Sequence, residues 1–310
     1  MKKALVLLNM GGPNSLKEVE LFLKNMFNDK NIITVKNSFI RSLIAFMIVN
    51  SRKKEAQENY KNLGGKSPII GHTKRLIEKL QNELKDTYVT YAMRYTPPFA
   101  KDVIKDIKER NITQITLIPL YPHYSTTTTK SSLEDFYLNA KEFKLNHIEK
   151  FYENKNFNRV LIKKIKDELK EKDSNEYNLI FSVHSLPQKI IDRGDPYQKE
   201  ILSHVELLKK ELKNQNLNFK SISLAYQSKL GPVKWLKPSL EEKLKSFKKG
   251  KVIISPISFT IDNSETEFEL NIEYNEIAKE LKITDYLVAK CPNDDDDFVN
   301  VLISIFNSFR

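Results

Sequence analysis

Cysteine is nearly absent from this sequence, since Cys291 is the single one in 310 residues. One cysteine cannot form an intramolecular disulfide, a four-cysteine zinc site or a cysteine-ligated iron–sulfur cluster. We therefore expect no iron–sulfur cluster and a reducing, cytoplasmic setting.

Long hydrophobic segments are also missing. The best candidate, FIRSLIAFMIV at 39–49, has 11 residues and contains Arg41, whereas a bilayer span needs about 20 apolar residues. Two interpretations of this segment stay open: a helix partly buried against the body, and an exposed apolar lip that contacts a bilayer surface or an apolar ligand. The N-terminal MKKALVLLNMGGP is similar to a signal peptide, but Asn9 and Gly-Gly-Pro end its apolar run early. It predicts a first strand.

Several motifs with known chemistry do not occur. The sequence has no G-x-G-x-x-G, no G-x-x-x-x-G-K-[ST], no H-E-x-x-H and no G-x-S-x-G. Their absence disfavours a dinucleotide or P-loop site, a zinc protease of that type and a serine hydrolase.

The charge balance is basic, with 51 Lys and Arg against 40 Asp and Glu and a formal net charge of +11. An excess of this kind favours acidic partners, such as nucleic acid, anionic lipid or a carboxylate-bearing small molecule. The lysines are spread over many segments rather than gathered in one basic arm. We therefore do not expect a nucleic-acid partner.

Near-continuous apolar runs alternate with charged helical patterns along the chain. Such runs are typical of strands buried on both faces, and their alternation with helices predicts a parallel α/β sheet. The runs are ALVLLNM (4–10), YVTYAMRY (88–95), QITLIPLY (114–121), NLIFSVH (178–184), SISLAYQ (221–227), KVIISPISF (251–259) and YLVAKCP (286–292).

The runs fall into two similar sets. LVLLNMGGP matches LIFSVHSLP, YVTYAMRYTPP matches SLAYQSKLGP, and TLIPLYPHYS matches VIISPISFT. The pairs occur in the same order, and each run has an apolar stretch, a polar residue at its end and then Pro or Gly. We expect an α/β half over 1–155, with an inserted lip over about 14–60, and a second α/β half over 156–310. Because ligands bind beyond the carboxyl ends of parallel strands, the strand ends of both halves should line a cleft between them.

The strongest acidic feature is FTIDNSETEFELNIEY at 259–274. Ser264 and Glu267 have the spacing of a capping box, and the four-residue spacing of Glu265, Glu269 and Glu273 places them on one face of the following helix. A solvated acidic face and a row that binds a cation or relays protons are both compatible with this pattern.

His184 follows a predicted strand, as Glu265 does. An imidazole titrates near neutrality, and together with a carboxylate it could form a site for ferrous iron. Tyr121 and Trp235 lie in aromatic-rich segments and could stack on a flat ligand. A structural role is the alternative for each of these residues.

Taken together, these stretches resemble ferrochelatases, which insert ferrous iron into a porphyrin. The motifs follow the family order along nearly the whole chain: LLNMGGP (7–13), SPIIGHT (67–73), MRYTPP (93–98), YPHYSTTTTKSS (121–132), FSVHSLPQKIIDRGDPY (181–197), YQSKLGPVKWLKP (226–238) and FTIDNSETEFELNIEY (259–274).

The resemblance assigns roles to particular residues. It implies that His184 and Glu265 are the metal-site pair and, with Glu269, the catalytic residues. It also implies two Rossmann-like halves and a last helix, about 295–310, that packs back on the first half. The predicted porphyrin-binding residues are Met10, Arg94, Tyr95, Tyr121 and Trp235. Asn263 stands where the family often has a second histidine, which puts a proton relay through that position in doubt.

The resemblance implies a lyase that inserts Fe²⁺, as a substrate, into protoporphyrin IX to give protohaem, with no permanently bound cofactor. We also expect a peripheral contact with the inner face of the membrane. The alternatives are a coproporphyrin ferrochelatase, another tetrapyrrole metal chelatase, and a haem or porphyrin carrier without catalysis.

Overall fold

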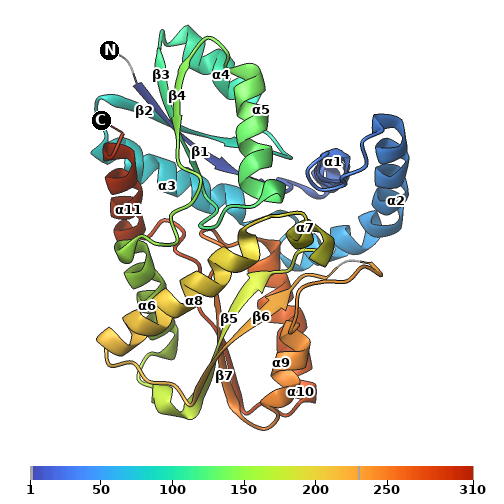
Figure 1. Cartoon of the computed structure of the whole chain (residues 1–310), viewed down its shortest axis with the longest axis vertical. Helices are drawn as coiled ribbons and strands as arrows, with labels where there is room; N and C mark the ends of the chain where they lie inside the picture. Colours follow the sequence, from blue (N-terminus) through green and yellow to red (C-terminus); the bar gives the residue numbers. More distant parts are fainter. Residues whose placement is uncertain (1–2, 230, 310) are drawn as a thin grey trace. The chain divides into compact units, whose positions relative to one another are not determined.

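The computed structural model describes residues 3–229 and 231–309, which divide into two compact units. Unit 1 contains residues up to Lys150 together with Asp294 onward, and unit 2 contains Phe151–Asn293. Figure 1 shows a sheet with surrounding helices in each unit. In the described part of the chain, no helix is long and apolar enough to cross a membrane.

Unit 1 is built on four parallel strands in the order β2-β1-β3-β4. Its elements are β1 (Lys3–Asn9), the 3₁₀ turn η1 (Leu16–Glu18), α1 (Val19–Asn28), α2 (Ser38–Asn62), α3 (Ile69–Glu83), β2 (Thr87–Met93), α4 (Ala100–Glu109), β3 (Gln114–Pro119), the π-helix η2 (Thr126–Lys130), α5 (Ser131–Asn139), β4 (Lys144–His147) and α11 (Asp296–Asn307).

Unit 2 repeats this arrangement with four parallel strands in the order β6-β5-β7-β8. Its elements are α6 (Lys155–Leu169), the 3₁₀ turn η3 (Ser174–Glu176), β5 (Tyr177–His184), α7 (Gln188–Asp192), α8 (Tyr197–Asn214), β6 (Ser221–Gln227), α9 (Leu240–Ser246), β7 (Lys251–Pro256), the π-helix η4 (Glu265–Glu273), α10 (Tyr274–Glu280) and β8 (Asp285–Val288). The prediction of two similar α/β halves with parallel sheets is confirmed.

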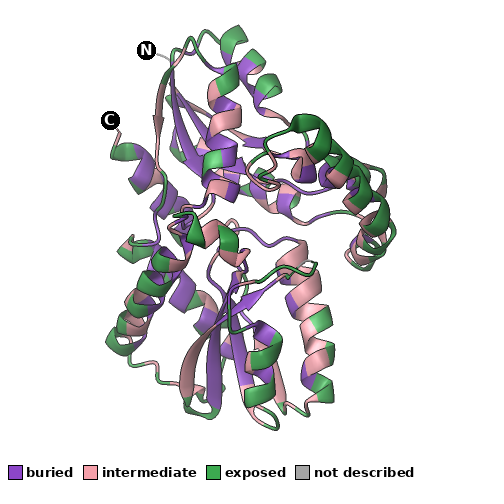
Figure 2. Ribbon diagram, turned by 45° about the vertical axis from the view of Figure 1, so that its right-hand side comes forward, coloured by how far each residue is buried: buried purple, intermediate pink, exposed green. Residues whose placement is uncertain are grey.

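Apolar side chains explain why these elements form. The residues of β1 from Ala4 to Leu8 are at most 2% exposed, and Figure 2 colours the central strands of both sheets as buried. In α4, Val103, Ile104 and Ile107 lie on one face and pack into the core of unit 1. The matching core of unit 2 lies between its strands and helices α9 and α10.

The predicted strand set was incomplete, because β4 was not expected. Its sequence, Lys-Leu-Asn-His, is half-exposed at the edge of the sheet and therefore lacks the apolar run that marks the other strands.

Helix α11 belongs to unit 1 although it follows unit 2 in the chain. It contacts α3, beside which it lies in Figure 1, and it also contacts β3. Lys79 on α3 donates to the Asp296 carboxylate at 2.7 Å and to the Asp294 carbonyl at 2.7 Å. The last helix is thereby fixed to the first sheet by apolar packing and by ion pairs.

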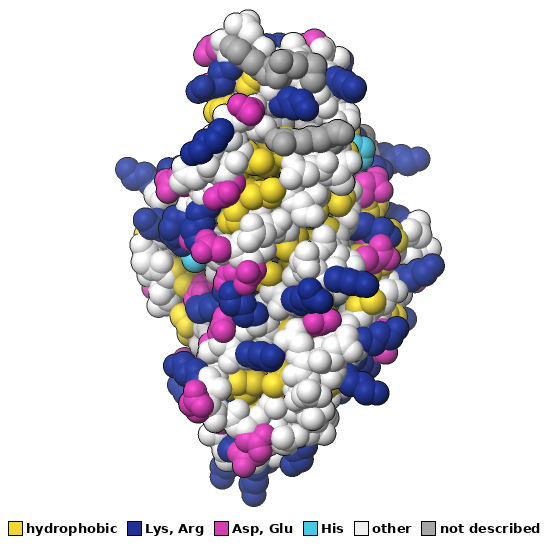
Figure 3. Space-filling model, turned by 90° about the vertical axis from the view of Figure 1, so that its left-hand side faces the viewer, with side chains coloured by type: hydrophobic (Ala, Val, Ile, Leu, Met, Phe, Trp, Pro, Cys, Tyr) yellow, Lys and Arg dark blue, Asp and Glu magenta, His cyan; other side chains and the backbone are white. Residues whose placement is uncertain are grey.

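The charged side chains are dispersed over the surface. On the face shown in Figure 3, Lys and Arg side chains are interspersed with Asp and Glu rather than gathered in one continuous basic patch. On this face, the basic side chains that contribute to the chain's net charge of +11 are therefore separate rather than clustered.

Candidate functional site

His184 is the last residue of β5, and its backbone is anchored on both sides. Its amide N–H donates to Ser258 Oγ at 3.1 Å, and its carbonyl accepts from the Tyr197 hydroxyl at 2.9 Å. Tyr197 is held in turn by the turn that precedes it, since its own amide donates to Asp195 Oδ1 at 3.0 Å. The Gly-Asp-Pro-Tyr segment therefore supports the backbone of His184.

The helix in the acidic segment does not begin with the predicted capping box. Ser264 makes no side-chain cap bond, and Asn263 instead accepts from the Glu265 amide at 2.8 Å. The prediction of a Ser264–Glu267 box was wrong because the turn into the helix places the side chain of Asn263, one residue earlier, over the first free amide.

The helix that carries the glutamates is a π-helix over Glu265–Glu273, whereas an α-helix was expected. π-Helical turns are rare and often mark functional sites. The three glutamates run along it from the interior to the surface, since Glu265 and Glu269 are half-buried and Glu273 is exposed. The row is therefore more than a solvated acidic face.

Asp262 fixes the loop that leads into this π-helix. Its side chain is almost fully buried and accepts from Thr266 Oγ1 at 2.8 Å, from Asn293 Nδ2 at 2.6 Å and from the Cys291 amide at 3.3 Å. A buried carboxylate with this many donors is well satisfied, so it holds the loop in one conformation.

His184 and Glu265 lie side by side. Strand β5 lies between β6 and β7, and η4 follows β7, so the sheet order brings the two residues together across 81 positions of sequence. His184 Nδ1 and Glu265 Oε2 are 2.6 Å apart, and the side chains are 38% and 20% exposed. His184 Nε2 makes no hydrogen bond within the described residues.

This contact changes the acidity of both groups. Burial by itself lowers the pKa of His184, but the Glu265 carboxylate outweighs burial, and the net pKa lies above the usual 6.5. Burial raises the pKa of Glu265, whereas the charge and hydrogen bond of His184 lower it further, below its usual value. The pair thus favours an ionised carboxylate facing a readily protonated imidazole.

Glu269 joins this pair through Ser228. The Ser228 amide donates to Glu269 Oε1 at 2.8 Å, and its hydroxyl contacts Glu265 Oε2 at 2.7 Å as well as Glu269 Oε2. Burial first, and then the charge of Glu265, raise the pKa of Glu269 to about 7. The three predicted catalytic residues therefore form one hydrogen-bonded cluster in unit 2.

Trp235 lies in the segment that follows β6, also in unit 2. It forms an isolated bridge with Pro187, close in sequence to His184, and its ring is half-buried. The indole Nε1 is buried without a hydrogen-bond partner among the described residues. Its predicted role as an aromatic wall stays a prediction.

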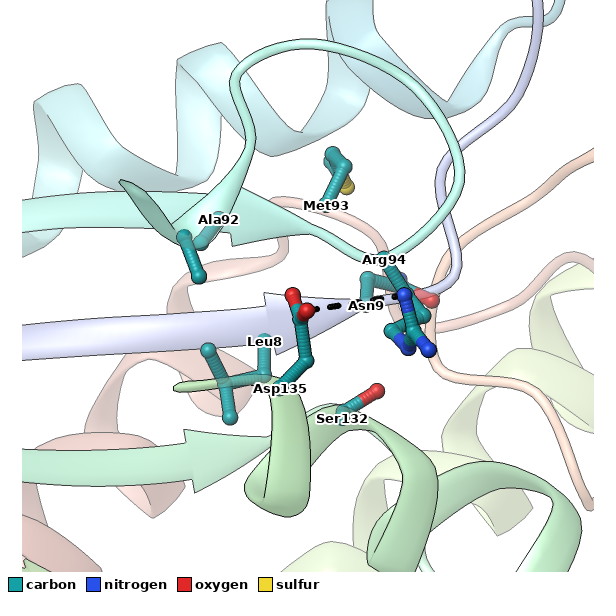
Figure 4. A pocket seen from close by; sticks show the side chains of 8 residues that line it. Leu8, Asn9, Ala92, Met93, Arg94, Ser132 and Asp135 are labelled. Carbon is teal, nitrogen blue, oxygen red and sulfur yellow. Dashed lines mark ion pairs between the residues drawn. The ribbon is translucent and has the colours of Figure 1, made fainter. Parts of the chain in front are cut away.

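The other predicted porphyrin-binding residues lie in unit 1, at the carboxyl ends of its strands. Arg94 follows β2, and its guanidinium contacts Asp29 at 3.1 Å and Asp135 at 3.6 Å. Figure 4 shows the Arg94–Asp135 ion pair. Both residues line a small cavity of about 10 Å³. Two carboxylates of its own chain thus engage the guanidinium, and a porphyrin carboxylate would compete with them.

Tyr95 and Tyr121 lie next to this ion-pair network, and the backbone carbonyl of Met10 accepts from the Tyr95 amide at 3.0 Å. Tyr95 is 3% exposed, and its hydroxyl donates to Asp29 Oδ2 at 2.9 Å. Tyr121 is half-buried with its hydroxyl 3.1 Å from Ser132 Oγ, and Met10 is half-buried. Tyr95 offers a ligand little surface, whereas Met10 and Tyr121 keep part of theirs open.

Ser228, Tyr197 and Ser258 were not predicted to belong to the site. Each contacts His184, Glu265 or Glu269 through hydrogen bonds between distant segments. For Ser228 the sequence showed only its place directly after the predicted strand SISLAYQ (221–227), since the pairing of Gln227 with His184 is visible only in the sheet. The other two serve the backbone of His184, and no sequence pattern marks such a contact.

Known proteins with the same sequence pattern identify the family. The sequence model described as Ferrochelatase matches residues 2–308. The chain belongs to the ferrochelatase family. It is 56% identical to the ferrochelatase of Nitratiruptor sp. over 98% of this chain and 99% of that protein, and 54% identical to that of Sulfurimonas denitrificans over 100% and 99%. The Helicobacter pylori ferrochelatase (strain HPAG1) is 46% identical, with 100% and 94% covered.

Solved structures add a likeness in fold. SirB from Bacillus subtilis with Fe³⁺ superposes with a TM-score of 0.61, covering 99% of this chain and 95% of that one, at 11% identity. DR2241 from Deinococcus radiodurans, described as similar to chelatases, gives a TM-score of 0.57 at 11% identity, with 98% and 54% covered. At such low identity the likeness concerns the fold alone. Membership of the ferrochelatase family makes the chain a lyase that inserts iron into a porphyrin.

Proposed function

We propose that the porphyrin is protoporphyrin IX and the product protohaem, so that the chain catalyses the last step of haem biosynthesis. The observation that carries this choice is the apolar stripe on α2, where Phe39 is 78%, Phe46 is 63% and Met47 is 55% exposed. A vinyl-bearing porphyrin is apolar enough to arrive from a membrane, and such a stripe suits delivery from one. The family resemblance implies that members working on coproporphyrin tend to have a tyrosine near Met10, so Met10 favours the same choice.

His184 is the proposed acceptor of the pyrrole protons. Metal insertion releases two N–H protons from the ring, and His184 Nε2 is open while Nδ1 is bonded to Glu265. The carboxylate orients the imidazole and stabilises its protonated form. The alternative role for His184 is that of a metal ligand, since Nε2 cannot accept a proton and bind iron at the same time. In that case His184 and Glu265 would offer the iron one nitrogen and one oxygen ligand, a set small enough to release the metal to four ring nitrogens.

Glu269 and Glu273 are proposed to carry protons or iron between this pair and solvent. They lie on η4 in order of increasing exposure beyond Glu265. The bound porphyrin is proposed to be strained. A puckered ring exposes the lone pairs of its nitrogens, which a flat ring hides, and binding energy from the ring edges would supply that strain. No permanently bound cofactor and no iron–sulfur cluster are required.

A peripheral contact with the inner face of the membrane is part of the proposal. The exposed side chains of the stripe recur with helical spacing, and basic residues follow them on the same helix. The stripe consists of Phe39, Ile40, Leu43, Phe46 and Met47, and the basic residues are Arg52, Lys53 and Lys54. Apolar burial and attraction to anionic lipid would then act together.

The decisive experiment compares porphyrins. Purified protein is incubated anaerobically with Fe²⁺ and either protoporphyrin IX or coproporphyrin, and the loss of free-base fluorescence gives kcat/KM for each. We expect the higher kcat/KM for protoporphyrin IX. A higher value for coproporphyrin would overturn the proposed substrate while leaving iron insertion intact, and Co²⁺ or Ni²⁺ in competition would test the choice of metal.

A further inference from the structure

Ser228 occupies a constrained position at the edge of the His184–Glu265 pair. It directly follows Gln227, the residue of β6 that pairs with His184 in the sheet. Its φ is +65°, a backbone conformation that side-chain-bearing residues rarely adopt. The chain therefore holds a non-glycine residue here at a conformational cost, which points to a use for its side chain.

The side chain and the amide of Ser228 each bind a glutamate. The amide donates to Glu269 Oε1 at 2.8 Å, and the hydroxyl lies 2.7 Å from Glu265 Oε2 and in contact with Glu269 Oε2. We propose that Ser228 is a positioning residue for iron, which holds the Glu265 and Glu269 side chains together so that both can face one cation. This inference rests on the proposed role of these carboxylates in handling Fe²⁺.

The physical basis is the repulsion between two acidic side chains four residues apart on η4. Left to themselves, the side chains would separate and each would sample several rotamers. The Ser228 hydroxyl contacts both carboxylates, and the Ser228 amide also binds Glu269. These contacts hold the two side chains together before a metal binds. A divalent cation bound between the two side chains would interact with both carboxylates at short range, which a single carboxylate does not offer.

The repeat in unit 1 supports a positioning role at this place in the fold. There the residue after the second strand is Arg94, and its Nε donates to Ser131 Oγ at 2.9 Å, directly after the π-helix η2. In both units, then, the residue that follows the second strand is bonded to the π-helical segment or its end. Unit 1 has a fixed guanidinium at this point, whereas unit 2 has a small hydroxyl between two carboxylates.

The test uses two variants that both remove the hydroxyl. Ser228→Ala keeps a Cβ at positive φ, and Ser228→Gly fits that conformation without strain. In steady-state iron insertion, both should raise the KM for Fe²⁺ by about 10- to 100-fold, the usual effect of removing a group that orients a metal ligand. The KM for the porphyrin should stay unchanged. Ser223→Ala is the matched control, because Ser223 lies on the same strand and its hydroxyl contacts only the Leu179 carbonyl, at 3.5 Å.

The outcomes separate this inference from its alternatives. A rise in the porphyrin KM with an unchanged iron KM would overturn it and show that Ser228 contacts the porphyrin. A normal Ser228→Gly beside an impaired Ser228→Ala would also overturn it, since the backbone would then be the cause. Glu265→Gln and Glu269→Gln test the carboxylates themselves: if neither changes the iron KM, the proposed function of the pair fails irrespective of Ser228. Thermal unfolding of each variant identifies any loss of fold.

Discussion

At the scale of single residues, substitution of His184 is expected to have the largest effect on iron insertion. Replacing it by alanine removes the proton acceptor and the nitrogen ligand but leaves the two backbone bonds to Ser258 and Tyr197. We therefore expect His184→Ala to reduce iron insertion by at least about a hundredfold with an unchanged far-ultraviolet circular dichroism spectrum. His147→Ala is the control, because His147 also ends a strand and its side chain is similarly exposed, at 33%. Substantial turnover in His184→Ala would refute the assignment.

A second histidine, His204, makes unit 2 sensitive to acid. Its side chain is fully buried against Phe157, with Nε2 2.9 Å from Asn158 Oδ1, and burial lowers its pKa from 6.5 to about 3. Because the unfolded chain binds this proton more readily, the histidine contributes stability above pH 6.5 that is lost as the pH falls toward 3. The linkage predicts a loss of about 2 kcal/mol between pH 7.5 and pH 5.

His204→Gln should flatten this pH dependence, since the amide keeps a donor but does not titrate. The free energy of unfolding is measured in urea at both pH values from the fluorescence of Trp235, the single tryptophan, which lies in unit 2. The variant is expected to be less stable than the native chain at pH 7.5 but to lose less on acidification. An equal loss in both proteins would mean that other groups cause the acid sensitivity.

At the scale of secondary-structure elements, helix α2 leaves apolar side chains exposed without a stabilising role in the folded chain. Phe39→Asp and Phe46→Asp should each weaken sedimentation with anionic vesicles by about tenfold or more, because each buried aromatic ring contributes about 2 kcal/mol to transfer from water. The stability of the fold should change by less than about 0.5 kcal/mol. Leu138→Asp is the control, since Leu138 is 68% exposed on α5. Unchanged vesicle binding in both Phe variants would rule out membrane contact through this face.

How far the sequence could predict these elements depended on burial and on distance along the chain. The buried runs identified the central strands, but β4 was missed because its Lys-Leu-Asn-His lacks an apolar pattern. The spacing of Glu265 and Glu269 is compatible with α- and π-helices alike, so the π-helix η4 could not be distinguished. The positions of His184 and Glu265 after predicted strands suggested a shared site, and the family resemblance paired them. The sheet order that brings them together was not predicted. A single serine such as Ser228 carries no pattern of its own.

At the scale of the whole molecule, the last helix stabilises the unit that is made first. Helix α11 follows unit 2 in sequence, yet its buried face packs on α3 and β3 of unit 1. Leu302, in the middle of α11, is fully buried, so Leu302→Ala should cost about 2 to 5 kcal/mol. Amide hydrogen exchange should become faster in α3 and β3 while peptides of unit 2 keep their protection, because local stability follows the packing of each unit.

Leu208→Ala provides the mirror-image control for this experiment, since Leu208 is equally buried on α8 of unit 2. It should accelerate exchange in unit 2 and leave α3 and β3 protected. If Leu302→Ala instead accelerates exchange equally in both units, the two units unfold as one cooperative body, and α11 stabilises that whole body rather than the first sheet. A response confined to unit 1 would mean that the first sheet attains its full stability only after residues 294–309 have been synthesised, because these residues complete its packing.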